Sequence, residues 1–250
     1  MNQSDLAALY AARSALRSER LQRFMLLRLG AVQGVIFDLD GTMVDTAPDF
    51  ELAINAMRAD YGLTPLPLQQ ITDCIGKGSE HLVRETLAPG MDPAYAEAEF
   101  ANALRAYQNH YHKINGQLAR PFPQVYRGLA RLQDAGMALA CVTNKPYALA
   151  MTLLEKTGLA PYFSLVYGGD SLPMKKPHPL PIREVCRVWS LMPDQVLMVG
   201  DSSNDVAAAR AAGCLVLTVP YGYNHGQPIA DAGADQMVDD LSQVASLLCV

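Results

Sequence analysis

Two carboxylates stand almost side by side at the end of an apolar run near the start of the chain. The stretch from Gly34 to Phe50 reads GVIFDLDGTMVDTAPDF, so the apolar run leads into Asp38 and Asp40 with only Leu39 between them. Two carboxylates this close repel each other unless a divalent cation lies between them or one of them holds a proton. Either arrangement would be useful in moving a phosphoryl group.

Three further segments carry related side chains, and each comes after an apolar run. They are Thr143-Asn144-Lys145, Lys175-Lys176-Pro177 and the acidic stretch from Gly200 to Asp205. Carboxylate oxygens are ligands that suit Mg²⁺, whereas lysines, hydroxyls and backbone N–H groups suit phosphate. One such segment alone has an ordinary explanation, because Asp201 could cap a helix and Lys176 could be a solvated loop charge. Four in succession favour a common site.

The elements that must position these residues alternate between short apolar runs and helical patterns. This alternation predicts an α/β fold with a doubly wound, mostly parallel sheet, whose strands deliver ligand-binding residues at their carboxyl ends. The strands are expected at Val35–Leu39, Ala138–Thr143, Leu165–Tyr167, Val196–Val199, Leu215–Val219 and Gln236–Val238. The helices between them are expected at Val125–Asp134, Pro146–Thr157, Leu180–Ser190 and Asn204–Ala212.

One region interrupts the alternation. Between about Pro48 and Pro121 we find no convincing strand, and three segments have helical patterns: Phe50–Tyr61, Ser79–Leu87 and Pro93–Ile114. We therefore expect an inserted all-helical cap over residues 48–121. The α/β core would comprise residues 32–47 and 122–250, and residues 1–31 would form an N-terminal helical extension.

The N-terminal extension is arginine-rich and favours a helix. We expect an amphipathic helix that packs on the body or joins two copies into a homo-oligomer, although Met25 is an alternative start. The whole chain has 20 Lys and Arg against 25 Asp and Glu, with no basic block. We therefore expect no nucleic-acid partner. No apolar stretch is long enough for a membrane span, so no membrane partner is expected. Five scattered cysteines without a CxxC pair favour the cytoplasm.

The order of the motifs resembles that of the haloacid-dehalogenase-like hydrolase superfamily. The segments DLDGT, VTN, KKP and GDSSND carry this resemblance, which covers nearly all of the chain from Val32 onward. The segments DTAPDF, VTNKP, KKPHP, AARAAG and PYGYNHG are similar to its phosphoglycolate phosphatase branch. The resemblance implies a phosphatase that works through an aspartyl-phosphate.

In that family the first aspartate would be the nucleophile and the second the acid and base, which are here Asp38 and Asp40. The resemblance implies that Mg²⁺ is held by the Asp38 carboxylate, the Asp40 backbone carbonyl and Asp201. Asp205 would support the metal site indirectly, by helping to orient the residues that bind the ion.

The transferring phosphoryl group would be held by Thr143 and by the backbone of Asn144. Lys176 would neutralise charge near Asp38 and the phosphate. Phosphoryl transfer depends mostly on positioning and charge neutralisation, so the residue types suit the implied roles.

The cap would close over the site and contact the substrate. Its loop Ile75-Gly76-Lys77-Gly78-Ser79 could meet a small anion through backbone N–H groups and the lysine, with Gly76 and Lys77 as substrate-binding residues. The alternative is an ordinary turn between helices with a surface lysine.

We expect a small phosphorylated metabolite as partner and a Mg²⁺-dependent phosphatase that converts 2-phosphoglycolate to glycolate. The alternatives are a phosphatase for another small phosphate monoester and a β-phosphoglucomutase. A phosphonate hydrolase, which would need a cap lysine such as Lys77, and a non-catalytic binding module are less favoured.

Overall fold

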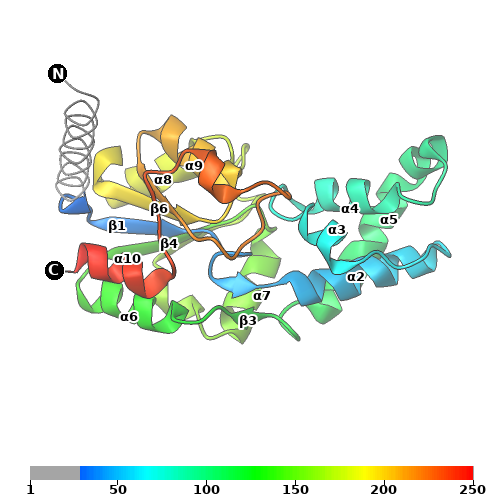
Figure 1. Ribbon diagram of the computed structural model, residues 1–250, viewed down its shortest axis with the longest axis horizontal. Helices are drawn as coiled ribbons and strands as arrows, with labels where there is room; N and C mark the ends of the chain where they lie inside the picture. The colour runs from blue at the N-terminus through cyan, green and yellow to red at the C-terminus, as the bar shows by residue number, and fades with distance from the viewer. Residues whose placement is uncertain (1–28, 250) are drawn as a thin grey trace, which may run out of the picture.

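The computed structural model describes residues 29–249 and shows the expected alternation of strands and helices (Figure 1). The strands are β1 Gly34–Phe37, β2 Val44–Asp45, β3 Arg120–Pro121, β4 Ala138–Val142, β5 Leu165–Tyr167, β6 Val196–Gly200, β7 Leu215–Thr218 and β8 Gln236–Met237. The helices are α2 Ala47–Asp60, α3 Leu68–Thr72, α4 Ser79–Leu87, α5 Pro93–Ile114, α6 Val125–Asp134, α7 Tyr147–Lys156, α8 Leu180–Trp189, α9 Ser203–Ala212 and α10 Leu241–Leu248. Short 3₁₀ turns are η1 Ala160–Tyr162, η2 Pro193–Gln195 and η3 Ile229–Ala232.

Six strands form one parallel sheet in the order β5-β4-β1-β6-β7-β8. Strand β1 pairs with β4 on one side and β6 on the other, so the chain winds outward in both directions from β1. The strand order therefore reverses at β1, and this is where such sheets place their ligand sites. The predicted doubly wound α/β fold is confirmed.

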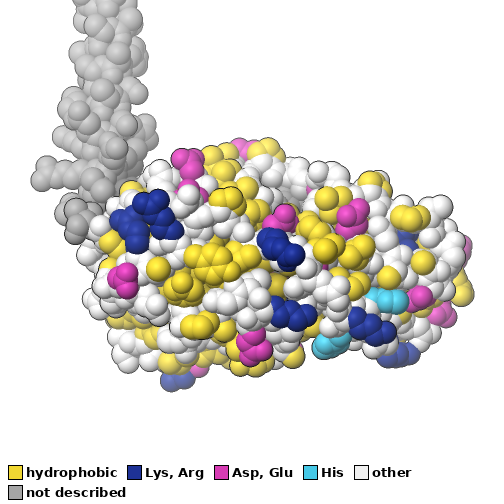
Figure 2. Space-filling model, turned by 90° about the horizontal axis from the view of Figure 1, so that it is seen from below, with side chains coloured by type: hydrophobic (Ala, Val, Ile, Leu, Met, Phe, Trp, Pro, Cys, Tyr) yellow, Lys and Arg dark blue, Asp and Glu magenta, His cyan; other side chains and the backbone are white. Residues whose placement is uncertain are grey.

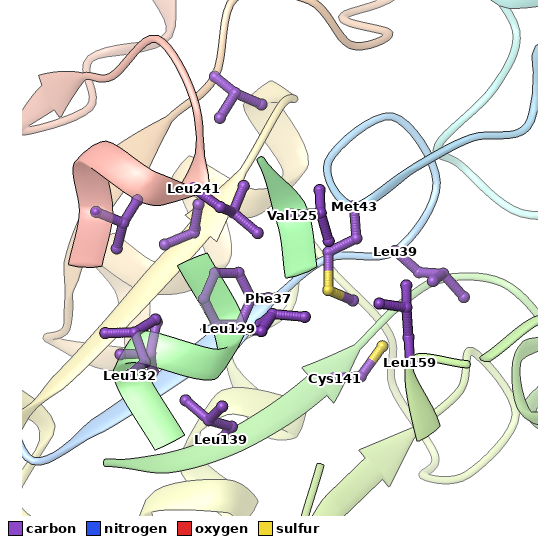
Figure 3. Close-up of a cluster of buried hydrophobic side chains, with 14 of the residues drawn as sticks. Phe37, Leu39, Met43, Val125, Leu129, Leu132, Leu139, Cys141, Leu159 and Leu241 are labelled. Carbon is purple, nitrogen blue, oxygen red and sulfur yellow. The ribbon is translucent and has the colours of Figure 1, made fainter. Parts of the chain in front are cut away.

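Helices cover both faces of this sheet, and a hydrophobic cluster fills each interface. In Figure 1, α6 and α10 lie below the strands, and α8 and α9 lie above them. Figure 3 shows the first cluster, in which Phe37 of β1 lies among Leu129 and Leu132 of α6 and Leu241 of α10. The second cluster joins β1, β4, β6 and β7 to α8 and α9. Burial on both faces explains why the strands are continuous apolar runs.

A block of four helices, α2 to α5, projects from one end of the sheet (Figure 1). Its hydrophobic cluster includes Ile54, Met57 and Leu82 and extends to Leu149 and Tyr223 of the core. Arg58 is buried in this block and donates hydrogen bonds to the carbonyl groups of Thr64, Thr86 and Pro89. The boundaries of the cap and core domains stay a prediction.

The block joins the sheet through a feature that the sequence analysis did not predict. Strands β2 and β3 form a two-stranded antiparallel ribbon at the junction. Each strand has only two residues, which is too short for an alternating pattern to be recognised. The buried carboxylate of Asp49 closes the junction, because it accepts N–H groups of Gly116 at 2.6 Å and of Leu118 at 2.8 Å.

Two helices were also missed, and several boundaries differ by one to three residues. Helix α3 has five residues and α10 has eight, so neither displays many turns of a helical pattern. Helix α2 begins at Ala47, three residues before the predicted start, because Pro48 occupies its first turn. Helices α4, α5 and α6 have the predicted bounds.

Residues 1–28, which include most of the predicted N-terminal extension, lie outside the described residues. No helix among the described residues has the length and apolarity that membrane crossing requires. On the face shown in Figure 2, the described Lys and Arg side chains form separate groups among acidic and neutral ones rather than a continuous basic band.

Close contact between α6 and α10 gives a test of the packing. A Cβ added to Gly128 would lie 2.5 Å from the backbone oxygen of Leu241, and backbone cannot rotate away as a side chain can. We expect Gly128→Ala to lower the free energy of unfolding by about 1 to 3 kcal/mol despite the better helix propensity of alanine. Urea unfolding measures this change. The exposed neighbour serves as control, since Arg127→Ala should change stability by less than about 0.5 kcal/mol; equal effects would contradict the packing.

Candidate active site

The two aspartates of the opening motif lie directly after β1, at the point where the strand order reverses. Asp38 is 7% exposed and Asp40 is 9% exposed. The N–H of Asp38 still continues the sheet by donating to the carbonyl of Val199 at 3.0 Å. The chain then turns sharply at Gly41, whose φ of +84° favours glycine, and a Cβ there would lie 2.4 Å from Asp201 Oδ2. Glycine therefore lets the residues that follow β1 and β6 come close together.

Lys176 lies between two of the buried carboxylates. Its Nζ is 2.9 Å from Asp38 Oδ1 and 2.7 Å from Asp205 Oδ1, and it donates to the carbonyl of Val142 at 2.6 Å. Burial opposes the charge of Lys176, but the attraction of Asp205 and Asp38 outweighs burial and raises its pKa above the usual value. The ammonium stays charged and holds Asp38 in place.

Three carboxylates converge at this point. Asp38, Asp201 and Asp205 each offer an oxygen within 4.8 Å of the others. Burial, followed by the repulsion of Asp38 and Asp205, raises the pKa of Asp201 well above its usual range. Burial also raises the pKa of Asp38 to about 7, although Lys176 counteracts it. A divalent cation would relieve this repulsion, and a set of carboxylate oxygens suits Mg²⁺.

The three carboxylates differ in the partners that they already have. Asp201 accepts Thr42 Oγ1 at 2.5 Å and the N–H of Tyr223 at 2.6 Å. Asp205 accepts Lys176 on one oxygen and the N–H and hydroxyl of Ser202 on the other. Asp205 therefore caps α9 and fixes Lys176, which fits its predicted supporting role, while Asp38 and Asp201 suit direct contact with a metal ion.

Tyr223 connects this acidic cluster with the start of the helical block. Its hydroxyl donates to Asp45 Oδ1 at 2.5 Å and accepts the N–H groups of Thr46 and Ala47, both at 3.1 Å. The same residue's backbone N–H binds Asp201. Through its backbone N–H and its hydroxyl, this one residue thus connects a predicted metal ligand to the first residue of α2.

The structure brings Thr143 and Asn144 to the same edge of the sheet. Thr143 is buried beside the cavity, and its Oγ1 accepts the N–H of Lys145 at 3.1 Å. The Asn144 amide donates to the carbonyl groups of Gly76 and Lys176, both at 2.8 Å. Asn144 therefore ties the loop that carries Lys176 to the cap loop, a side-chain contact that the sequence analysis did not anticipate.

The two predicted cap residues have different positions. Gly76 lines the cavity next to Asp38, whereas Lys77 is exposed and does not line it. The substrate-binding role of Lys77 stays a prediction.

A small cavity lies between the strand ends and the helical block. Its lining residues are Asp38, Asp40, Phe50, Ile75, Gly76, Gly78, Ser79, Leu82, Tyr107, Tyr111, Thr143, Asn144, Lys145, Pro146 and Leu149. The centre of a water molecule can reach only about 30 Å³ of it, which is room for about two waters. The cavity is mostly apolar, and the two aspartates of the opening motif are among the residues that line it.

The sequence analysis assigned no role to Lys145, which is 5% exposed in this cavity. Its Nζ lies 3.0 Å from Asp40 Oδ1 and 2.5 Å from the Tyr111 hydroxyl. Lys145 directly follows Thr143-Asn144 at the end of β4. This position in the sequence could have predicted that Lys145 belongs to the site. Its aromatic partners Phe50 and Tyr111 come from α2 and α5, and no local sequence pattern places them there.

A site of aspartates and lysines at the switch point of a doubly wound sheet, beneath inserted helices, defines a class of α/β enzymes. The model of the haloacid dehalogenase-like hydrolase family matches residues 35–219 of this chain. The chain belongs to this family of hydrolases, which confirms the resemblance of its motifs.

Individual relatives are similar over most of their length. A phosphoglycolate phosphatase of Thiobacillus denitrificans is 42% identical over 217 residues, covering 87% of this chain and 96% of the relative. A plasmid-encoded phosphoglycolate phosphatase of Cupriavidus necator is 44% identical over 214 residues, covering 86% and 92%. The crystal structure of a predicted phosphoglycolate phosphatase from Haemophilus somnus matches with a TM-score of 0.83 and 35% identity, covering 87% of this chain and 98% of the other.

The position of Asp38 gives the most direct test of the site. Asp38→Asn keeps the size of the side chain but removes the negative oxygen, so we expect the rate of 4-nitrophenyl phosphate hydrolysis to fall at least about 1,000-fold. Initial rates in the presence of Mg²⁺ measure this loss. Asp134→Asn, an exposed change at the end of α6, should leave the rate unchanged; a loss of less than tenfold in Asp38→Asn would assign the nucleophile elsewhere.

A second test measures the acidic cluster without using turnover. Mg²⁺ that binds only the folded state should raise the melting temperature by several degrees at concentrations far above its Kd. Asp201→Asn should remove most of this increase, and Asp134→Asn should keep it. Because the pKa of Asp38 is raised to about 7, protons compete with the ion, and more Mg²⁺ should be needed at pH 6 than at pH 8. An unchanged increase in Asp201→Asn would place the ion elsewhere.

Proposed function

We propose that this enzyme is a Mg²⁺-dependent phosphatase that hydrolyses 2-phosphoglycolate to glycolate and phosphate through an aspartyl-phosphate. The observation that carries the proposal is that Asp38 contacts Lys176 and lies close to Asp201, directly beside a small cavity that Asp38 and Asp40 line. The relatives named phosphoglycolate phosphatase, at 42% and 44% identity, support the choice of substrate.

In the first step, a carboxylate oxygen of Asp38 attacks phosphorus, and the bond between phosphorus and the bridging oxygen breaks. Asp40 gives its proton to that oxygen, so glycolate leaves as an alcohol rather than as an alkoxide. In the second step, water attacks the phosphorus of the aspartyl-phosphate, and Asp40 takes up a proton from the water. Asp38 is thereby regenerated and inorganic phosphate is released.

The negative charge that gathers at Asp38 in both steps needs cations close by. Lys176 supplies one, at 2.9 Å from Asp38 and held by Asp205. Mg²⁺, when bound by Asp38, Asp201 and the Asp40 backbone carbonyl, supplies further positive charge at the phosphoryl oxygens. Thr143 Oγ1 and the backbone N–H of Asn144 would orient the phosphoryl group.

The size of the cavity supports a small substrate. The helical block contacts the strand ends through Gly76 and Asn144, and the cavity that Asp38 and Asp40 line has little open volume. An ester with two carbon atoms in its leaving group needs less rearrangement of these helices than a hexose phosphate. This difference favours 2-phosphoglycolate over the substrate of a phosphoglucomutase.

All five cysteines are free thiols, and this supports the proposal that the enzyme works in the reducing cytoplasm. Its proposed partner there is a small phosphorylated metabolite rather than nucleic acid or a membrane.

A panel of substrates tests the proposed function. We expect kcat/KM for 2-phosphoglycolate to exceed that for glucose 6-phosphate and β-glucose 1-phosphate by at least about 100-fold, measured by phosphate release with Mg²⁺ present. Conversion of β-glucose 1-phosphate to glucose 6-phosphate without phosphate release would instead indicate a mutase. A preference for another small monoester would support the proposed phosphatase mechanism but contradict 2-phosphoglycolate as the substrate.

A further inference from the structure

We propose that Lys145 is the residue that binds the carboxylate of the substrate and thereby selects 2-phosphoglycolate among small phosphate esters. This inference rests on the proposed function and names the group that gives it its specificity. Lys145 belongs to the core, at the end of β4, whereas the sequence analysis looked for this cation in the cap at Lys77.

The covalent structure of 2-phosphoglycolate dictates where its carboxylate must lie. The phosphoryl group has to face Asp38, and the bridging oxygen has to face Asp40, which protonates it. A single methylene joins that oxygen to the carboxylate. The carboxylate therefore lies beside Asp40 in a mostly apolar cavity, where an anion removed from water is costly unless a cation is close to it.

Lys145 is at that position. Its Nζ is 3.0 Å from Asp40 Oδ1, and among the described residues it is the one basic side chain that lines the cavity. Lys176 is engaged on the other side, with Asp38, Asp205 and the carbonyl of Val142. Lys77 is exposed and does not line the cavity.

The surroundings of Lys145 prepare it to bind an anion. The ammonium group has three N–H donors, and its hydrogen-bond partners in the described residues are Asp40 and the Tyr111 hydroxyl. Its Nζ lies 4.7 Å from the ring centre of Phe50 and 4.6 Å from that of Tyr111. The two rings stack with their centres 4.9 Å apart, which restricts where the ammonium can go. A water-poor, aromatic surrounding strengthens its attraction for a carboxylate.

The cation and its aromatic neighbours come from different parts of the fold. Lys145 follows a core strand, and Phe50 and Tyr111 belong to helices α2 and α5 of the inserted block. The carboxylate subsite is therefore complete only when these helices lie against the strand ends, as they do in this structure. The position of Lys145 Nζ therefore selects substrates by the length of the leaving group, because a longer leaving group would place its anionic end beyond Nζ.

A matched pair of substrates separates this role from an effect on Asp40. Ethyl phosphate has a methyl group where 2-phosphoglycolate has the carboxylate, and both need the same acid at the bridging oxygen. We expect Lys145→Met to lower kcat/KM for 2-phosphoglycolate about 100-fold or more, and that for ethyl phosphate tenfold or less. The cap lysine and an exposed lysine of α5 are compared in parallel: neither Lys77→Met nor Lys113→Met should change the ratio of the two kcat/KM values.

Binding of inert analogues gives a readout that does not depend on turnover of the analogue. 3-Phosphonopropionate replaces the bridging oxygen of 2-phosphoglycolate by a methylene, and propylphosphonate also lacks the carboxylate. With 4-nitrophenyl phosphate as reporter, Lys145→Met should raise the inhibition constant of 3-phosphonopropionate about 100-fold and leave that of propylphosphonate nearly unchanged. Lys145→Gln replaces the Met variant if the latter does not fold, as judged by circular dichroism.

The outcomes distinguish this inference from the proposed function. Equal losses for the two substrates in Lys145→Met, with equal changes for the two phosphonates, would overturn the inference and leave Lys145 as a partner of Asp40 alone. A selective loss in Lys77→Met would assign the carboxylate to the cap lysine and also overturn it. A wild-type enzyme that hydrolyses ethyl phosphate as well as 2-phosphoglycolate would instead overturn the proposed substrate.

Discussion

The structure depends on the pairing of buried negative charge with buried positive charge at one edge of the sheet. Asp38, Asp40, Asp201 and Asp205 are all less than 10% exposed, and a carboxylate removed from water is costly unless it is paired. Lys176 and Lys145 are also buried, and each neutralises different carboxylates. Lys176 serves Asp38 and Asp205 on one side, and Lys145 serves Asp40 on the other. Asp201 has no lysine partner among the described residues, and its carboxylate lies close to that of Asp38, which suits a divalent ion.

The topology of the sheet explains why these six side chains can meet. Their segments are far apart in sequence, but each follows a strand, or precedes a helix, at the same edge of one parallel sheet. Strand β1 lies inside the sheet, with β4 and β5 on one side and β6, β7 and β8 on the other. The two aspartates that follow β1 can therefore contact residues from both halves of the sheet. The apolar clusters on the two faces hold the strands in register, so the charged edge is supported by a large buried core.

Much of this arrangement could be predicted from the sequence, because parallel strands and strand-end motifs are local patterns. The order of four motifs and the strand–helix alternation indicated the sheet, the inserted helices and the convergence of Asp38, Asp201 and Lys176. The features that could not be predicted depend on contacts between segments that are distant in the sequence. The ribbon of β2 and β3 is too short to have a pattern, and the pairing of Lys145 with Tyr111 depends on how the inserted helices dock. Lys77 is the opposite case. Its flanking glycines favoured a substrate-binding role, but its side chain is exposed.

Tyr223 links two parts of the molecule that have separate tasks. Its backbone N–H binds Asp201, and its hydroxyl binds Asp45 and the N–H groups that begin α2. A rotation of the inserted helices about the ribbon would therefore act on a residue that orients the carboxylate of Asp201, a predicted metal ligand. By thermodynamic linkage the effect is reciprocal: an ion that favours one orientation of Asp201 must also favour one angle of the helices. Binding of the ion and access of the substrate would then be coupled through Tyr223.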